Sequence, residues 1–495
     1  MTTGSTPWAS ALVLWLLAPY GAGFTVALLP ALATPLLVSS TLATVLLGAW
    51  TLRSGSTITL QLVGEYGVSL CLDPLAGWFL VLAGLVCFAV WIEARRQGWD
   101  RTGWLLLLVL LGALNTCFLT TDLISLYVSL EVVAISAFLL LLKGATTQAS
   151  WIGLRYLLVS NTAMGLYLIG TALVYAQSGS FGFAALAGLP PGAPLAFVLV
   201  GLLTKSGVFL NGLWLPRTHA EAPPEVSALL SGVVVGAGAL PLLRLEGVSP
   251  AIQQLLVPMA LAGSALGVIY ALVVEDGKLL LAWSTLAQMG LVVLTPAAGG
   301  PMALSHGLAK AALFLSSRHW PNRSLQGWRQ RPQAWGLQLP LWLGSLSIAG
   351  LPPLLGFSAK KQLQAALDPG PAGLLMVLSI GSVAIFARLW GAPCRTNIGA
   401  PLCFGALLLS LPLLLVTPFF MAPDSWRSDG LRALAVLGAG LLLHLVLEQL
   451  GRGDRFSLPP LDRLPDLLGG LGLVGAGLLV MMAGGVRHAM PAAGG

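Results

Sequence analysis

Long apolar stretches dominate the chain, and short polar stretches separate them at regular intervals. An apolar run of about 18 or more residues is typical of a helix that crosses a bilayer. Such runs predict an all-α, polytopic membrane protein with about 14–16 transmembrane helices. The runs lie near 8–28, 32–52, 74–92, 103–120, 123–142, 153–175, 193–214, 225–243, 251–274, 279–297, 300–316, 336–366, 371–390, 400–420, 431–449 and 467–484.

The loops between these segments alternate in charge. Basic residues gather in loops that follow odd-numbered segments, from Arg95 to Arg463. Loops after even-numbered segments carry mainly acids, such as Asp122, Glu246 and Asp368. Because basic loops stay on the cytoplasmic side, we expect the odd-numbered loops in the cytoplasm and the N-terminus outside.

The composition agrees with this interpretation. The chain has 495 residues, of which 57% are hydrophobic and only 9% are charged. A soluble protein carries about 25% charged residues, so this chain has too few to cover a water-facing surface. We therefore expect an integral multi-pass protein of a bacterial plasma membrane or an equivalent energy-transducing membrane, in contact with the lipid bilayer. The net charge of +7 is attributed to topology, and no nucleic-acid partner is expected.

The sequence contains no recognisable cofactor-binding motif. It contains no phosphate-binding loop of the GxxxxGK[ST] type. The five cysteines form no CxxC pair and mostly lie in apolar runs, and the five histidines are scattered. We expect no cofactor, no metal site and no enzymatic activity, and we interpret the chain as a transporter subunit.

Ionisable residues lie deep inside four of the apolar segments. Glu131 lies in "LISLYVSLEVVAISAFLLLL", and Lys205 lies near the middle of "APLAFVLVGLLTKSGVFLNGLWLP". His306 and Lys310 share one helix face in "MALSHGLAKAALFL", and Lys360 follows in "GLPPLLGFSAKKQL". A lysine at mid-depth costs at least about 2.5–3.5 kcal/mol, so each such residue indicates a functional site. Together these residues are the parts of a proton relay.

Simpler explanations exist for single members of this set. Lys360 or its neighbour Lys361 could extend its side chain to the interface, and His306 could be a packed, hydrogen-bonded histidine. As a relay, the carboxylate of Glu131 would hold Lys205 protonated. Movement or neutralisation of that carboxylate would release the proton toward His306 or Lys310 through intervening water.

Two of the segments contain helix breakers. Pro352 and Pro353 interrupt the twelfth segment, and Gly207 and Gly212 flank a polar "TKSG" in the seventh. Interrupted helices in corresponding halves of a chain indicate a transport site at mid-depth. The spacing predicts N-terminal helices over 1–102, a first five-helix unit over 103–245, a second over 246–395, and C-terminal helices over 396–495.

Four stretches carry a resemblance to a known family. They are "WLPRTHAEAPPEVSALLSG", "LAWSTLAQMG", "HGLAKAALF" and "GLPPLLGFSAK". The chain resembles the antiporter-like proteins, which are the proton-channel subunits of respiratory complex I and the large subunits of Mrp-type sodium/proton antiporters. The resemblance implies two inverted five-helix repeats and other membrane subunits as partners. It also implies a hydrated axis lined by residues that match Glu131, Lys205, His306, Lys310 and Lys360.

The chain departs from that family at two places. Gly236 and Ser231 stand where the family often has a lysine or a histidine in the eighth helix, and Arg217 replaces the acid of an "LPDA" motif. The wording "HAEAPPEVSALLSG" favours the D subunit of a Mrp-type antiporter, which exchanges protons for sodium. A channel subunit of a complex I-like oxidoreductase, a subunit of an inorganic-carbon uptake complex, and a scaffold subunit without transport remain alternatives.

Overall fold

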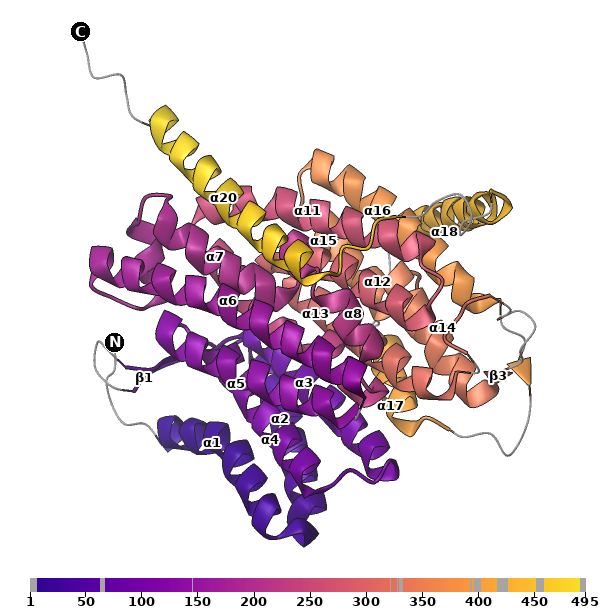
Figure 1. Ribbon diagram of the computed structural model, residues 1–495, viewed down its shortest axis with the longest axis horizontal. Helices are drawn as coiled ribbons and strands as arrows, with labels where there is room; N and C mark the ends of the chain where they lie inside the picture. The colour runs from indigo at the N-terminus through magenta and orange to yellow at the C-terminus, as the bar shows by residue number, and fades with distance from the viewer. Residues whose placement is uncertain are drawn as a thin grey trace.

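The computed structural model is almost entirely helical (Figure 1). It describes residues 7–62, 67–144, 146–320, 322–326, 328, 333–391, 394–395, 402–415, 426–450 and 458–489. The first helices are α1 (Pro7–Leu28), α2 (Ala33–Ser54), α3 (Pro74–Arg96), α4 (Arg101–Leu119), α5 (Leu123–Leu141) and α6 (Thr147–Ser178). The middle of the chain forms α7 (Ala193–Ser206), α8 (Leu215–Glu221), α9 (Pro224–Leu229), α10 (Gly236–Glu246), α11 (Pro250–Val273), α12 (Gly277–Val292) and α13 (Pro296–Ser316).

The C-terminal part adds six further helices and little else in the described ranges. They are α14 (Trp335–Ala349), α15 (Leu355–Ala365), α16 (Pro369–Trp390), α17 (Phe404–Leu415), α18 (Trp426–Gln449) and α20 (Leu464–Ala489). Two short sheets complete the secondary structure, antiparallel β1 (Ile58–Gln61) with β2 (Ser69–Leu72) and parallel β3 (Gln333–Ala334) with β4 (Cys394–Arg395). Short 3₁₀ turns and one π-helical turn occur at η1 (Pro30–Leu32), η3 (Leu142–Gly144), η4 (Phe183–Gly188), η5 (Phe209–Gly212), η6 (Leu230–Val234) and η7 (Ser317–His319).

The fold confirms an all-α, integral multi-pass membrane protein. Within the described ranges, eleven helices are long and apolar enough to cross a membrane, or twelve if α7 and the bent continuation Phe209–Glu221 form one span. Every one of the predicted apolar segments contains at least one helix. The number of full spans is below the expected 14–16 because α12, α13, α14, α15 and α17 are shorter or less uniformly apolar.

Both expected helix interruptions are present. Helix α7 ends at Ser206, and Gly207 takes the left-handed conformation with a φ of 69°. Helix α14 ends at Ala349, and Gly350 takes the same conformation with a φ of 84° before α15 starts. Left-handed backbone suits glycine because glycine has no Cβ, so each glycine stops a helix inside an apolar segment.

Aspartate side chains start several of the helices. Asp100, Asp122 and Asp276 each accept a hydrogen bond from the backbone N–H three residues later, at 2.9, 2.7 and 3.0 Å. This contact satisfies one of the free N–H groups at a helix start and is worth about 1 kcal/mol. The acids of the predicted loops therefore also define where α4, α5 and α12 begin.

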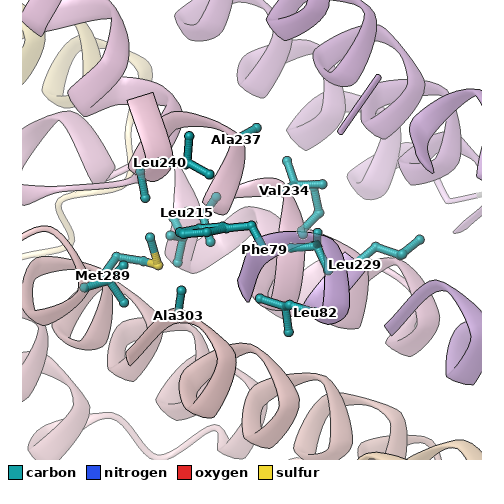
Figure 2. Packing of buried hydrophobic residues seen from close by; sticks show 14 of the residues in the cluster. Phe79, Leu82, Leu215, Leu229, Val234, Ala237, Leu240, Met289 and Ala303 are labelled. Atoms are coloured by element: carbon teal, nitrogen blue, oxygen red, sulfur yellow. The ribbon is translucent and has the colours of Figure 1, made fainter. Parts of the chain in front are cut away.

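An apolar cluster fills the centre of the molecule (Figure 2). Helix α3 contributes Phe79 and Leu82 and packs against α9, η6, α10 and α13, and the same cluster includes Leu215 of α8 and Met289 of α12. Glycines let η6 approach α13 closely, since a Cβ added at Gly307 would lie 2.4 Å from the carbonyl oxygen of Gly232. Elsewhere α6 packs along α7, α11 along α12, α16 along α18, and α20 crosses α7 (Figure 1).

Candidate functional site

The interruption of α7 is stabilised by side chains that bond its free carbonyl groups. Trp214 Nε1 donates to the carbonyl oxygen of Thr204 at 2.8 Å. Asn211 Nδ2 donates to the carbonyl oxygen of Val200 at 3.1 Å. A broken helix survives in a membrane only where such partners exist. Lys205 lies in the last turn of α7, where the partial negative charge of the helix end favours a cation.

Lys205 and Glu131 form an ion pair inside the protein. The Lys205 ammonium donates to Glu131 Oε1 at 3.1 Å, to Ser160 Oγ at 2.6 Å and to the carbonyl oxygen of Leu130 at 3.3 Å. An ammonium has three N–H groups, so these acceptors satisfy all of them. The side chain of Lys205 is 7% exposed and that of Glu131 is 20% exposed.

The surroundings of this pair are partly polar. Asn161 lies beside the second oxygen of Glu131, and with its amide oriented to donate, its nitrogen is 3.2 Å from Oε2. A cavity of about 10 Å³ adjoins Lys205 and is lined by Tyr156, Ser160 and Trp214, among others. A cavity of that size has room for about one water molecule. The pair therefore lies in a site that a proton could reach or leave through water.

His306 and Lys310 form a second buried cluster on α13. The Lys310 ammonium donates to the carbonyl oxygen of Leu281 at 2.7 Å and to Ser284 Oγ, both on α12. It also lies 5.3 Å from the ring centre of Phe386. No described carboxylate forms an ion pair with Lys310, and neither ring nitrogen of His306 hydrogen-bonds to a described group. Lys310 is 0% exposed, so it is a buried lysine without a counter-charge among these residues.

The sequence interpretation missed two members of this cluster. His219 on α8 is 0% exposed and lies within electrostatic range of His306, Lys310 and Lys278. Its ring packs edge-on against Phe314 at 6.1 Å, and neither ring nitrogen has a described hydrogen-bond partner. Lys278, which the hydropathy pattern assigned to a loop, is 6% exposed and donates to the carbonyl oxygen of Ala222 at 2.6 Å.

The sequence alone gave little indication that His219 and Lys278 are buried. Both lie in stretches where polar and apolar residues mix, so neither interrupts an apolar run as Lys205 does. His219 lies in the stretch "WLPRTHAEAP", which forms the short helix α8. Only the expectation of a helix in this stretch could have indicated that the histidine is buried.

The region between the two clusters is largely apolar. A Cβ added at Gly236 would lie 3.2 Å from the ring of Phe79, so packing leaves no free space for a longer side chain there. Polar groups lie only on the Lys310 side of this region, where Ser231 Oγ lies 2.7 Å from Thr285 Oγ1 in the described part of the chain. Thr285 Oγ1 in turn donates to the carbonyl oxygen of Leu281, which also accepts from Lys310. The hydroxyl groups of Ser231 and Thr285 thus lie near the place where the family resemblance predicts a lysine or a histidine.

Lys360 lies apart from both clusters at the second helix interruption. Its ammonium donates to the carbonyl oxygen of Ala349, the last residue of α14, at 3.3 Å. Within the described residues, no hydrogen bond or ion pair joins Lys360 to Glu131, Lys205, His306 or Lys310. The predicted site residues therefore occupy three separate places, and among the described residues only Glu131 and Lys205 of this set form an ion pair with each other.

Arg217, which replaces an expected acid, has acidic partners in this chain. Arg217 Nε donates to Asp462 Oδ2, and a second contact of 4.0 Å reaches Glu221. Arg155 NH1 donates to the backbone oxygen of Asp462. Asp462, just before α20, thus supplies a negative charge beside Arg217 on α8, where the family motif has an acid. The described residues contain no group of three or more His, Cys, Asp and Glu side chains that could hold a metal ion.

Comparison with known proteins identifies the family. Residues 120–385 match the sequence profile of the transmembrane family described as "NADH:quinone oxidoreductase/Mrp antiporter, TM". The chain belongs to this family. The matched range contains Glu131, Lys205, His306, Lys310 and Lys360, so all predicted site residues lie in the family's own region.

Relatives of this chain include subunits of an NADH-quinone oxidoreductase and of a Na(+)/H(+) antiporter. The chain is 33% identical over 361 residues to the N subunit of the NADH-quinone oxidoreductase of Desulforudis audaxviator, covering 64% of this chain and 70% of the relative. It is 28% identical over 397 residues to the D subunit of the Na(+)/H(+) antiporter of Alkalihalophilus pseudofirmus, covering 71% and 80%. The resemblance inferred from the sequence is therefore confirmed at the level of the family.

Solved structures share the fold of this family member. A chain of the membrane-bound sulfane sulfur reductase, an archaeal respiratory membrane complex, superposes with a TM-score of 0.74 at 21% identity, covering 88% of this chain and 99% of the other. A chain of the Mrp complex from Dietzia sp. superposes with a TM-score of 0.71 at 22% identity, covering 96% and 98%. At these identities the likeness extends to the fold.

Proposed function

We propose that this protein conducts protons across a membrane as one subunit of a larger complex. The observation that carries the proposal is the buried ion pair of Glu131 and Lys205 at the interruption of α7. At 3.1 Å and an effective dielectric constant of about 20, the attraction between such charges is about 5 kcal/mol. Loss of the partner charge would therefore change the protonation of Lys205 strongly.

The proposed mechanism uses Glu131 as a movable or titratable partner. While its carboxylate is in place, Lys205 stays protonated with all three N–H groups bonded. When that carboxylate is protonated or displaced, Lys205 gives up its proton through water toward the second cluster. There His306, His219 and Lys310 are the acceptors, and Lys360 is the last member of the relay. Protons are passed from group to group and no covalent bond of a substrate is made or broken, so the proposed role is that of a transporter subunit.

For the complex itself, we propose a Mrp-type sodium/proton antiporter, with this chain in the role of its D subunit. The relative from Alkalihalophilus pseudofirmus supports this assignment, since the alignment covers 80% of its length. A channel subunit of a quinone-reducing complex is the second candidate, which the 33% identity to an oxidoreductase N subunit favours. Family members of both kinds belong to multi-subunit assemblies, so other membrane subunits are the proposed partners.

One experiment tests the proposal and separates the two candidates. The complete gene cluster is expressed in membrane vesicles of a bacterium that lacks its own antiporters, and a pH-sensitive dye is followed. Sodium addition should move protons in the wild type and in the surface control Lys143→Ala, but not in Lys205→Ala or Glu131→Gln. Proton movement that requires quinone reduction and ignores sodium would instead favour the second candidate. Sodium-driven movement that survives both substitutions would refute the relay.

A further inference from the structure

A cavity of about 330 Å³ opens between α15, α16 and α18, away from the paired lysine. Its lining contains three basic residues, Lys360, Lys361 and Arg432, and one acid, Asp429. Lys361 and Asp429 form an ion pair of 2.5 Å, and the excess of two positive charges remains with the other two residues. The cavity is therefore suited to an anionic ligand.

The two remaining cations are not neutralised within the described part of the chain. The Lys360 side chain is 9% exposed, and its ammonium donates to one carbonyl oxygen, that of Ala349. An ammonium has three N–H groups, so two of them remain for a ligand in the cavity. No described carboxylate forms an ion pair with Lys360 or Arg432. A buried cation of this kind is stabilised when an anion supplies the missing charge.

Met376 lines the cavity, and further exposed apolar side chains lie next to lining residues on α16 and α18. Met376 and Val377 on α16 are 44% and 60% exposed, and Leu431 and Leu434 on α18 are 70% and 61% exposed. Both helices are apolar enough to cross a membrane, so these exposed side chains are available to lipid tails. A ligand at this place would meet basic groups inside the cavity and hydrocarbon at its rim.

The depth of the basic residues fits a lipid headgroup. Lys361 lies in the last two turns of α15, and Asp429 and Arg432 lie in the first two turns of α18. At 1.5 Å per residue, Arg432 is about 9 Å from the start of its helix. Lys360, which the sequence placed deep in an apolar segment, also lies in the last two turns of α15. All three basic residues are thus within two turns of a helix end, and helix ends lie near the bilayer surface, where phosphate groups are found.

We propose that this cavity binds the headgroup of an anionic phospholipid, with its acyl chains along the exposed faces of α16 and α18. Charge complementarity supports this occupant, because the surrounding membrane supplies a phosphate and hydrocarbon in one molecule. The lipid phosphate provides Lys360 with the counter-charge that Glu131 provides for Lys205. The binding itself does not depend on proton transport, so it can be tested separately from the proposed function.

The test measures lipid binding to the purified complex in detergent by native mass spectrometry and by thermal stabilisation. The probes are phosphatidylglycerol, phosphatidylcholine and inorganic phosphate. The double variant Lys361→Gln/Arg432→Gln should bind phosphatidylglycerol about 25-fold more weakly, at about fivefold per basic residue. Arg53→Gln/Arg101→Gln, which removes two exposed arginines elsewhere, should bind it like the wild type.

A gain-of-affinity variant guards against loss of binding through misfolding. Asp429→Asn removes the acid of the cavity and should strengthen phosphatidylglycerol binding about fivefold. Equal binding of phosphatidylglycerol by the wild type and the double variant would overturn the proposal. The proposal would also be overturned if phosphatidylcholine stabilised the complex as much as phosphatidylglycerol, or if inorganic phosphate displaced phosphatidylglycerol as well as free phosphatidylglycerol does. A copurifying subunit that cross-links to position 432 in place of lipid would overturn it too.

Discussion

Two buried lysines of this protein have opposite surroundings. Lys205 donates to a carboxylate, a hydroxyl and a carbonyl, and it ends an interrupted helix. Lys310 lies in the continuous helix α13, donates to a carbonyl and a hydroxyl, and has no described acidic partner. The first site holds its ammonium with an opposite charge, whereas the second holds it with neutral groups alone among the described residues, a carbonyl, a hydroxyl and the ring of Phe386. The two lysines should therefore respond differently when each is replaced.

The largest expected effect comes from breaking the ion pair on one side. Glu131→Gln leaves an ammonium, and Lys205→Met leaves a carboxylate, each without its partner. Each change should lower the free energy of unfolding by about 3–5 kcal/mol, because an uncompensated buried charge remains. The double variant Glu131→Gln/Lys205→Met should recover most of that loss. Thermal unfolding of the purified complex compares the stability of the single and double variants. A double variant that loses the sum of the two single losses would argue against a buried pair.

A smaller effect on stability is expected at the second lysine. Lys310→Met removes a cation without leaving a described carboxylate behind, and it keeps a similar side-chain volume. The free energy of unfolding should therefore change by less than about 1.5 kcal/mol, while proton flux is lost. The same unfolding assay, with Lys205→Met beside it, checks the difference. Equal destabilisation by the two substitutions would remove the contrast between the sites.

The smallest effect is expected for an ion pair on the surface. Lys143 Nζ lies 2.5 Å from Asp100 Oδ1, and Asp100 is 59% exposed. The hydrogen bond from Lys143, helped by the backbone N–H of Gly103, lowers the pKa of Asp100 below its ordinary value of 3.8. The stabilisation is therefore present above that value and is lost as the pH falls through the lowered pKa.

For this surface pair, Asp100→Asn keeps the helix cap and removes the charge. It should cost about 0.2–1 kcal/mol at neutral pH and make stability less dependent on pH below 4. Unfolding curves at several pH values measure this effect. A cost as large as that of breaking the buried pair would show that burial is not what distinguishes the two pairs.

Hydropathy predicted the helices well because an apolar segment in a membrane must form a helix to satisfy its backbone hydrogen bonds. Every apolar segment contains a helix, and the breakers Gly207 and Pro352–Pro353 lie at real interruptions. The pattern could not show that 225–243 divides into α9, a π-helical turn and α10, since all of it is buried and most of it is apolar. It also missed the antiparallel pair β1–β2, a short element of mixed polarity outside the apolar runs.

The site was predictable only where a charge interrupts an apolar run. Glu131 and Lys205 stand out for that reason, and the fold brings them into contact although 74 residues separate them. His219 and Lys278 lie in mixed sequence, so their burial required the structure. The partner of Arg217 was equally hidden, because Asp462 follows it by 245 residues and no spacing rule connects them. The division into two five-helix units remains a prediction.

The most direct test of the account is passive proton flux through the complex in sealed vesicles under an imposed pH gradient. The variants are Glu131→Gln, Lys205→Met and their combination, with Lys143→Met as the surface control. Each single substitution should stop the flux, and the double variant, although stable, should not restore it. The control should conduct like the wild type. Flux at the wild-type rate in either single variant would contradict the role of the buried pair.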